Sequence, residues 1–120
     1  EAAEVVCGIN ILEATGNADN LKEELGDLLL QVVLHAQIAE EEGLFTLEDV
    51  CRGISDKMIR RHPHVFGEET VNQSGEVVTR WNDIKKAEKA GKEWTESYLP
   101  AAFEEAKTLI DAARERKGFQ

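Results

Sequence analysis

Proline, aromatic residues and cysteine are all scarce in this chain, and each scarcity narrows what the sequence can encode. Only two of the 120 residues are proline, and 6% are aromatic. Aromatic residues are common in strands and proline is common in turns, whereas the Glu, Ala, Leu and Lys that are abundant here favour helices. The composition therefore predicts an all-α protein, and a helical bundle is the natural way to pack it.

Cationic residues and long apolar runs are also scarce. Lys and Arg number 14 against 24 Asp and Glu, which gives a formal net charge of −10. Proteins bind polymeric nucleic acid by neutralising its phosphates with Lys and Arg, so we do not expect such binding here. No apolar run approaches the ~20 residues that cross a bilayer, and no signal peptide is visible, so we expect no membrane association.

The two cysteines, Cys7 and Cys51, are far apart in the sequence and form no CxxC pair. Both lie among apolar residues, and we expect buried, reduced thiols rather than a disulfide or a metal site. Reduced thiols suit the cytosol, so the expected location is cytoplasmic.

A length of 120 residues corresponds to one domain, residues 1–120, with a modest core. Long helices in so small a domain leave apolar faces uncovered, and a dimer would cover them. The chain opens on Glu1 inside a helical pattern, without an initiator Met or a cap, so we expect the natural N-terminus to lie upstream. Residues 99–120 are expected to form a C-terminal helix or a linker to a further domain.

Start and stop signals divide the chain into helical segments. Gly43 ends the second segment, and Pro63 ends the third. Thr46 caps the third segment, where Asp49 completes a capping-box-like start. Pro100 suits the first turn of the last helix. The five expected helices span residues 1–14, 19–42, 47–62, 74–90 and 100–118, with a loop over 67–73.

Carboxylates border the apolar faces of the first two segments. The second segment carries a stripe with steps of three and four residues, namely Leu21, Leu25, Leu28, Val32, Ala36 and Ala39. At about 100° per residue, Glu24, Asp27 and His35 share one arc beside that stripe. Glu1 and Glu4 border the apolar face of the first segment in the same way. Each of the two helices therefore carries an acidic i,i+3 pair beside its packing face.

Packing these two helices together brings Glu1, Glu4, Glu24 and Asp27 towards one another. Clustered negative charges at the edge of a core are unfavourable unless a cation neutralises them. Oxygen ligands suit Mg²⁺ or Mn²⁺, and a di-iron bundle is disfavoured because the chain has no ExxH motif. The alternative is that both acidic pairs simply lie on solvated helix faces. His35, two turns beyond Asp27, is expected to support the ligands or to border the core.

The third segment ends in the densest basic patch of the chain, residues 56–64. Lys57 and Arg61 are four residues apart and share a helix face, so both can reach one polyphosphate. Trp81 and Lys85 repeat this spacing in the fourth segment, where a ring can stack on a nucleobase beside a cation. Each pair also has a plainer interpretation, since cations favour a helix C-terminus and a single Trp most often belongs to the core.

These motifs resemble those of one known family. Residues 22–33, KEELGDLLLQVV, resemble the metal-binding helix of the MazG nucleoside triphosphate pyrophosphohydrolases. Residues 60–66, RRHPHVF, are highly specific and are typical of the amino-terminal type of MazG domain. Trp81, Lys85 and the tail from Leu99 to Phe119 are similar to the family as well, so the resemblance covers nearly the whole chain.

The resemblance implies a four-helix-bundle-like fold of the all-alpha NTP pyrophosphatase type with an extra C-terminal helix, assembled as a homodimer or a dimer of dimers. It also implies Mg²⁺-dependent hydrolysis of NTPs or dNTPs to the nucleoside monophosphate and pyrophosphate, which cleans the nucleotide pool. The residues that match the family's metal ligands are Glu1, Glu4, Glu24 and Asp27. Those that match its substrate-binding residues are Lys57, Arg61, Trp81 and Lys85.

In the mechanism we expect, water attacks a phosphorus of the triphosphate and pyrophosphate leaves. Glu23, or one of the ligands Glu24 and Asp27, accepts the proton, and the sequence does not choose between them. An alternative from another class is a non-catalytic dimerising or nucleotide-binding domain of a tandem MazG protein. Within the enzyme class, related pyrophosphohydrolases of dUTP, dCTP or phosphoribosyl-ATP are rivals, and RRHPHVF argues against them.

Overall fold

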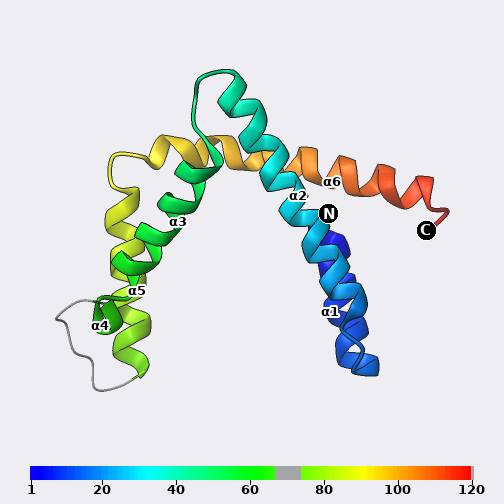
Figure 1. The fold of residues 1–120 in the computed structure, drawn as a ribbon, viewed down its shortest axis with the longest axis horizontal. Helices are drawn as coiled ribbons and strands as arrows, with labels where there is room; N and C mark the ends of the chain where they lie inside the picture. Colours follow the sequence, from blue (N-terminus) through cyan, green and yellow to red (C-terminus); the bar gives the residue numbers. More distant parts are fainter. Residues whose placement is uncertain (67–73, 120) are drawn as a thin grey trace. The chain divides into compact units, whose positions relative to one another are not determined.

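The computed structural model describes residues 1–66 and 74–119, and these residues form helices and no strand (Figure 1). The helices are α1 (Ala2–Thr15), α2 (Asp19–Glu41), α3 (Leu47–Arg61), α4 (Pro63–Phe66), α5 (Ser74–Lys89), the 3₁₀ helix η1 (Glu93–Tyr98) and α6 (Leu99–Arg116). The all-α class and the extra C-terminal helix are confirmed. The loop expected over 67–73 lies outside the described residues.

The chain divides into two compact units, Glu1–Ser55 and Asp56–Gln120, and the division falls within α3. The first unit holds α1, α2 and the start of α3. The second holds the end of α3 together with α4, α5, η1 and α6. The single domain expected over residues 1–120 stays a prediction.

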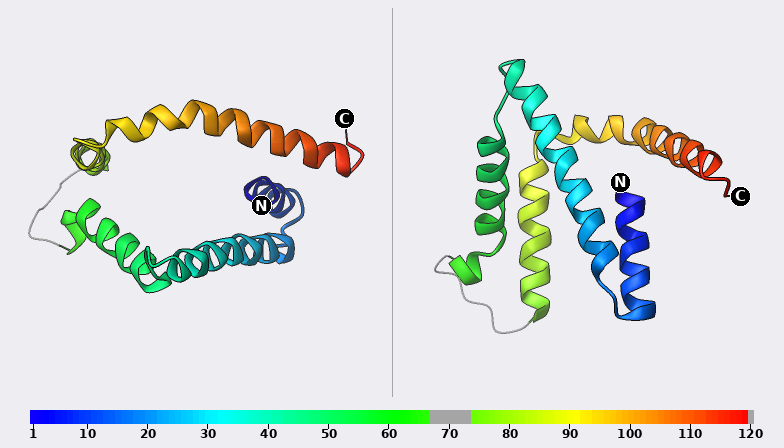
Figure 2. Two further views of the ribbon diagram at one scale, coloured as in Figure 1. Left: turned by 90° about the horizontal axis from the view of Figure 1, so that it is seen from above. Right: turned by 45° about the vertical axis from the view of Figure 1, so that its right-hand side comes forward.

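In the first unit, α1 and α2 lie side by side as an antiparallel hairpin (Figures 1 and 2). Gly16 ends α1 in the left-handed conformation, with φ 76°, and its N–H donates to the Leu12 carbonyl at 2.8 Å. A residue with a Cβ is sterically strained at such a φ, which is why glycine suits this position. The short turn that follows returns the chain along α1.

A close approach of the two helices occurs at Gly8, which is buried. A Cβ built on Gly8 would lie 2.8 Å from Leu21 Cα and 3.1 Å from Leu21 N, and 3.2 Å from Asn20 Oδ1. The Leu21 atoms belong to backbone and cannot swing aside, so the approach requires glycine. Glu4 lies one turn before Gly8, and Glu24 follows Leu21 by three residues, so this crossing sets the acidic pairs beside each other.

Little of the apolar stripe of α2 is buried. Ala36 and Ala39 are the buried hydrophobic residues among those described, while Leu25 is 48% exposed. Cys7 and Cys51 are free, as expected, but both are exposed. Their expected burial is wrong in the single chain, because the faces of α1 and α3 that carry them are not covered.

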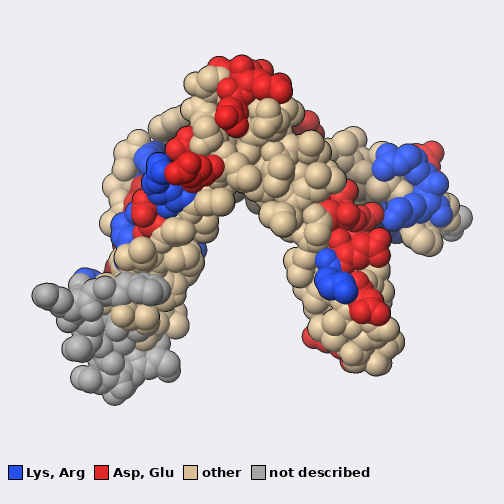
Figure 3. All heavy atoms as spheres, in the orientation of Figure 1, with Lys and Arg blue, Asp and Glu red and all other residues tan. Residues whose placement is uncertain are grey.

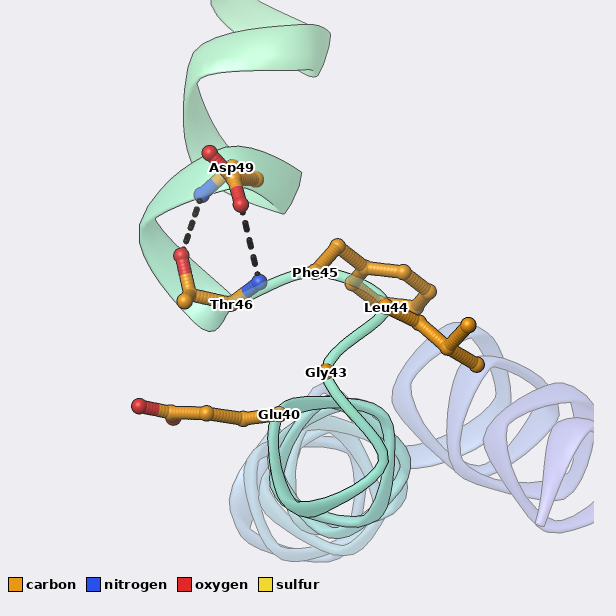
Figure 4. A pocket seen from close by; sticks show the side chains of 6 residues that line it. All are labelled: Glu40, Gly43, Leu44, Phe45, Thr46 and Asp49. Carbon is orange, nitrogen blue, oxygen red and sulfur yellow. Dashed lines mark hydrogen bonds between the residues drawn. The ribbon is translucent and has the colours of Figure 1, made fainter.

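The capping box at the start of α3 is confirmed. Thr46 N donates to Asp49 Oδ2 at 2.9 Å, and Asp49 N donates to Thr46 Oγ1 at 3.1 Å (Figure 4). The Thr46 backbone N–H at the Asp49 carboxylate, and the Thr46 side chain beside it, lower the pKa of Asp49. The same turn borders a surface hollow of about 260 Å³, lined by Glu40, Gly43, Leu44, Phe45, Thr46 and Asp49.

In the second unit, the end of α3 lies beside α5 (Figures 1 and 2). Pro100 occupies the first turn of α6, as expected. The 3₁₀ helix η1 before it was not expected, and its Thr95 and Ser97 hydroxyls donate to carbonyls three residues back. No helix in the described parts of the chain has the length and apolar character needed to span a membrane.

Candidate metal and nucleotide site

The acidic pairs of α1 and α2 converge in the first unit. Carboxylate oxygens of Glu1, Glu24 and Asp27 all lie within 4.8 Å of one another. Glu4 lies beside this group, close enough for its carboxylate to raise the pKa of Glu24. The structure therefore brings together three of the four residues that the sequence predicted as metal ligands, and it places the fourth, Glu4, beside Glu24. Figure 3 shows acidic side chains gathered over this hairpin.

The electrostatics of this carboxylate group are unfavourable without a counter-charge. Burial raises the pKa of Glu24, and the negative charges of Glu4 and Asp27 raise it further. Glu24 Oε2 is buried and has no hydrogen-bond partner in the part of the chain that the structure describes. A buried carboxylate oxygen left unpaired is costly, and a hard divalent cation would satisfy it. The residues present thus fit Mg²⁺ or Mn²⁺.

Local backbone structure fixes the position of Glu1. Its carbonyl accepts the N–H groups of Glu4 at 3.0 Å and Val5 at 3.1 Å, so it stands at the N-cap of α1. Glu23, the candidate proton acceptor, is exposed and adds to the negative charge that acts on Glu24. His35 lies outside the carboxylate group, and its Nδ1 is 2.7 Å from the Gln31 carbonyl oxygen.

The predicted nucleotide-binding residues lie in the second unit. Arg61 Cζ is 5.3 Å from the centroid of the Trp81 ring, a cation–π contact. His62 meets the same ring edge-on at 4.8 Å between centroids. Lys57 and Lys85 are half-buried, and among the described residues their ammonium groups form no hydrogen bond or ion pair. Arg61 and Trp81 are therefore brought together, with two cations available on the same helices.

Sequence reasoning missed Glu88, whose carboxylate binds two arginines. Arg61 Nη2 donates to Glu88 Oε2 at 2.7 Å, and Arg60 Nη2 to Oε1 at 2.7 Å. Hydrogen bonds from Arg61 and Arg60 hold the pKa of Glu88 at about 2. The signal was available in the helix period, because Glu88 follows Trp81 by seven residues and so lies on the same face of α5.

The fold and the carboxylate group define the class of protein: it is all-α, and its N-terminal helical hairpin brings an ExxE pair and an ExxD pair together. Residues 1–66, more than half of the chain, match the MazG nucleotide pyrophosphohydrolase domain. The chain belongs to the MazG family. The carboxylate group, Lys57 and Arg61 lie within the matched residues, whereas Trp81 and Lys85 lie beyond them.

Curated relatives agree with this assignment. The "Nucleoside triphosphate pyrophosphohydrolase" of Escherichia coli K12 is 55% identical over 74 residues, which cover 62% of this chain and 28% of that protein. The Thermotoga maritima "Nucleoside triphosphate pyrophosphohydrolase/pyrophosphatase MazG" is 58% identical over 76 residues, 63% of this chain and 28% of that protein. The uncharacterized YabN of Bacillus subtilis is 60% identical over 73 residues, 61% of this chain and 15% of that protein. The chain thus spans less than a third of each of these relatives, and no solved structure matches it significantly.

Proposed function

We propose that this chain hydrolyses nucleoside triphosphates to the nucleoside monophosphate and pyrophosphate, as an enzyme that cleans the nucleotide pool. The observation that carries the proposal is the carboxylate group of α1 and α2, with its unpaired Glu24 oxygen. Membership of the MazG family supplies the reaction class. The names of the E. coli and T. maritima relatives support the same activity.

In this proposal Glu1, Glu4, Glu24 and Asp27 hold Mg²⁺ or Mn²⁺. The ion, when bound, polarises phosphoryl oxygens and acidifies a water molecule. Glu23 is exposed beside this group, and it accepts the proton of the attacking water in our preferred assignment. Because Glu23 precedes Glu24 and is not itself a proposed ligand, it can accept a proton while all four ligands stay on the metal ion.

We assign the nucleotide itself to the predicted residues of the second unit. Lys57, Arg61 and Lys85 are cations that can bind the negatively charged oxygens of the triphosphate. Trp81 offers an aromatic surface for a nucleobase. Alanine substitution of Lys57 or Lys85 tests this assignment, because both ammonium groups are uncommitted and their loss should raise KM rather than unfold the chain.

The proposed assembly is a homodimer or a dimer of dimers in the cytoplasm. Its support is the apolar surface that the hairpin leaves uncovered, including Val6 at 56%, Leu29 at 61% and Ile38 at 54% exposure. Soluble monomers rarely expose contiguous apolar surface of this kind. Light scattering coupled to size exclusion measures the mass directly, and a monomer at micromolar concentration would contradict the assembly.

The activity is tested by incubating the protein with dNTPs and Mg²⁺ and measuring pyrophosphate. The matched variant replaces both Glu24 and Asp27 with alanine, and Asp19→Ala, an acidic change at the start of α2, is the control. Release of pyrophosphate that the double variant abolishes and the control retains supports the proposal. Absence of pyrophosphate, or its release by the double variant, refutes it.

The competing proposal is a non-catalytic nucleotide-binding domain. Calorimetry with a non-hydrolysable NTP measures binding, and comparison with the pyrophosphate assay distinguishes this role from that of a hydrolase. Binding without turnover in the presence of Mg²⁺ and of Mn²⁺ would establish the non-catalytic role. Family membership does not favour this alternative.

A further inference from the structure

A partly buried ion-pair cluster joins the end of α3 to α5 in the second unit. Glu88 receives Arg61 side-on, with Arg61 Nη2 at 2.7 Å and Nε at 3.1 Å from Oε2. Arg60 Nε lies 2.7 Å from Glu88 Oε1. The side chains of Arg61 and Glu88 are only 16% and 17% exposed, whereas that of Arg60 is 51% exposed.

In this geometry one edge of the Arg61 guanidinium is hydrogen-bonded to Glu88, and the opposite side of the group makes no such bond. Nε and Nη2 face Glu88, while Nη1 makes no hydrogen bond to a described residue. The same guanidinium contacts the Trp81 ring, with 5.3 Å from Cζ to the ring centroid. Arg61 is thus fixed in two directions, and one amino group remains for an anionic ligand.

We propose that Glu88 is a positioning residue for the triphosphate: it clamps Arg61 against Trp81 so that Nη1 is presented to a phosphate. This inference rests on the proposed function, in which Arg61 and Trp81 bind the nucleotide. Glu88 itself does not touch the substrate.

The charges of the cluster show why an acidic clamp does not expel the anion. Arg60 and Arg61 repel each other as chain neighbours, and Glu88 offsets that repulsion with both of its oxygens. The two arginines and Glu88 still sum to one positive charge, and Lys57 and Lys85 on the same helices add two more. Without the carboxylate, the partly buried Arg61 would lose the partner that fixes its guanidinium and could turn towards water.

The rival role for Glu88 is that of a competitor, which occupies the arginines until a phosphate displaces it. The two roles predict opposite effects of Glu88→Gln. Loss of a clamp lowers nucleotide affinity, since glutamine carries no charge and offers one acceptor oxygen where Glu88 uses two, one for each arginine. Loss of a competitor raises affinity.

The experiment uses a Trp94→Phe background, in which Trp81 is the one tryptophan of the chain. Glu88→Gln is compared with Glu96→Gln, which removes an exposed ion pair to Lys89 at 2.8 Å. We expect Glu88→Gln to raise KM for dNTP about tenfold with kcat within about twofold, and to lose the near-UV circular dichroism of Trp81. Glu96→Gln should change neither.

An unchanged or lower KM, or an unchanged Trp81 signal, in Glu88→Gln overturns the proposal. If Glu88→Gln does not fold by far-UV circular dichroism, Glu88→Asp replaces it, because aspartate keeps the charge but draws the carboxylate back from Arg61, and the same KM and Trp81 changes are expected. A parent chain that neither hydrolyses nor binds nucleotide refutes the proposed function itself. An active parent with an unaffected Glu88→Gln variant refutes only the role of Glu88.

Discussion

Replacing Gly8 with alanine tests whether the close approach of α1 and α2 builds the carboxylate group. The added Cβ would lie 2.8 Å from Leu21 Cα and 3.1 Å from Leu21 N. Carbon atoms in contact prefer about 3.5–4.0 Å, so the helices must separate by roughly 0.7 Å or more. Forcing a methyl group into so tight a contact costs about 1–3 kcal/mol.

The matched control is Gly53→Ala, inside α3, where a Cβ meets nothing within 4 Å. Both variants gain the helix propensity of alanine, which exceeds that of glycine by about 0.8–1.0 kcal/mol. The difference in free energy of unfolding between the two variants therefore isolates the steric cost, and we expect Gly8→Ala to be the less stable by about 1–3 kcal/mol. Urea unfolding measures both.

The same substitution should damage the site. Glu4 lies one turn before Gly8, so a wider gap between the helices moves Glu4 away from Glu24. We expect the affinity for Mn²⁺ to fall about tenfold in Gly8→Ala and to stay unchanged in Gly53→Ala. Equal stability and equal Mn²⁺ affinity in the two variants would refute the reasoning, because the helix crossing would then not build the carboxylate group.

Two further predictions concern single contacts. Thr46→Ala removes the hydroxyl that accepts Asp49 N–H, and it should cost about 1 kcal/mol in urea unfolding. The control is Thr108→Ala, which removes a hydroxyl that donates to a carbonyl within its own helix and should lower the free energy of unfolding by less than half as much. Equal losses of stability in the two variants would contradict the capping role of Thr46. Hydrogen bonds from Arg61 and Arg60 lower the pKa of Glu88 from 4.5 to about 2. The contribution of this ion pair to the stability of the fold is therefore fully present above pH 4.5 and is lost as the pH falls towards 2. The stability gap between the native chain and Glu88→Gln should narrow over that range, and a constant gap would contradict the ion pair.

Much of the fold follows from local signals that single residues carry. The left-handed glycines and the Thr46–Asp49 box mark helix ends wherever they occur, because their effect depends on a few neighbouring atoms. The i,i+3 spacing likewise places Glu24 and Asp27 on one arc of α2 before any partner helix is known. These features were predictable for that reason.

The remainder depends on contacts between distant residues. The sequence shows Gly8 as an isolated glycine in a helical pattern, and only the packing of Leu21 against it reveals why the residue is small. Glu88 shares a helix face with Trp81, yet its two arginines lie 27 and 28 residues away. The burial of Cys7 was misjudged because apolar neighbours in sequence do not specify what covers a helix face.

The most direct test of the central claim is a Mn²⁺ titration followed by electron paramagnetic resonance, which counts free ions at each step. The claim is that the carboxylates of α1 and α2 form one site for a divalent cation. The native chain should show saturable binding that Mg²⁺ displaces, and a Glu24→Gln, Asp27→Asn double variant should lose it while keeping its helical content. Equal binding by the double variant, or no saturable binding by the native chain, would contradict the account.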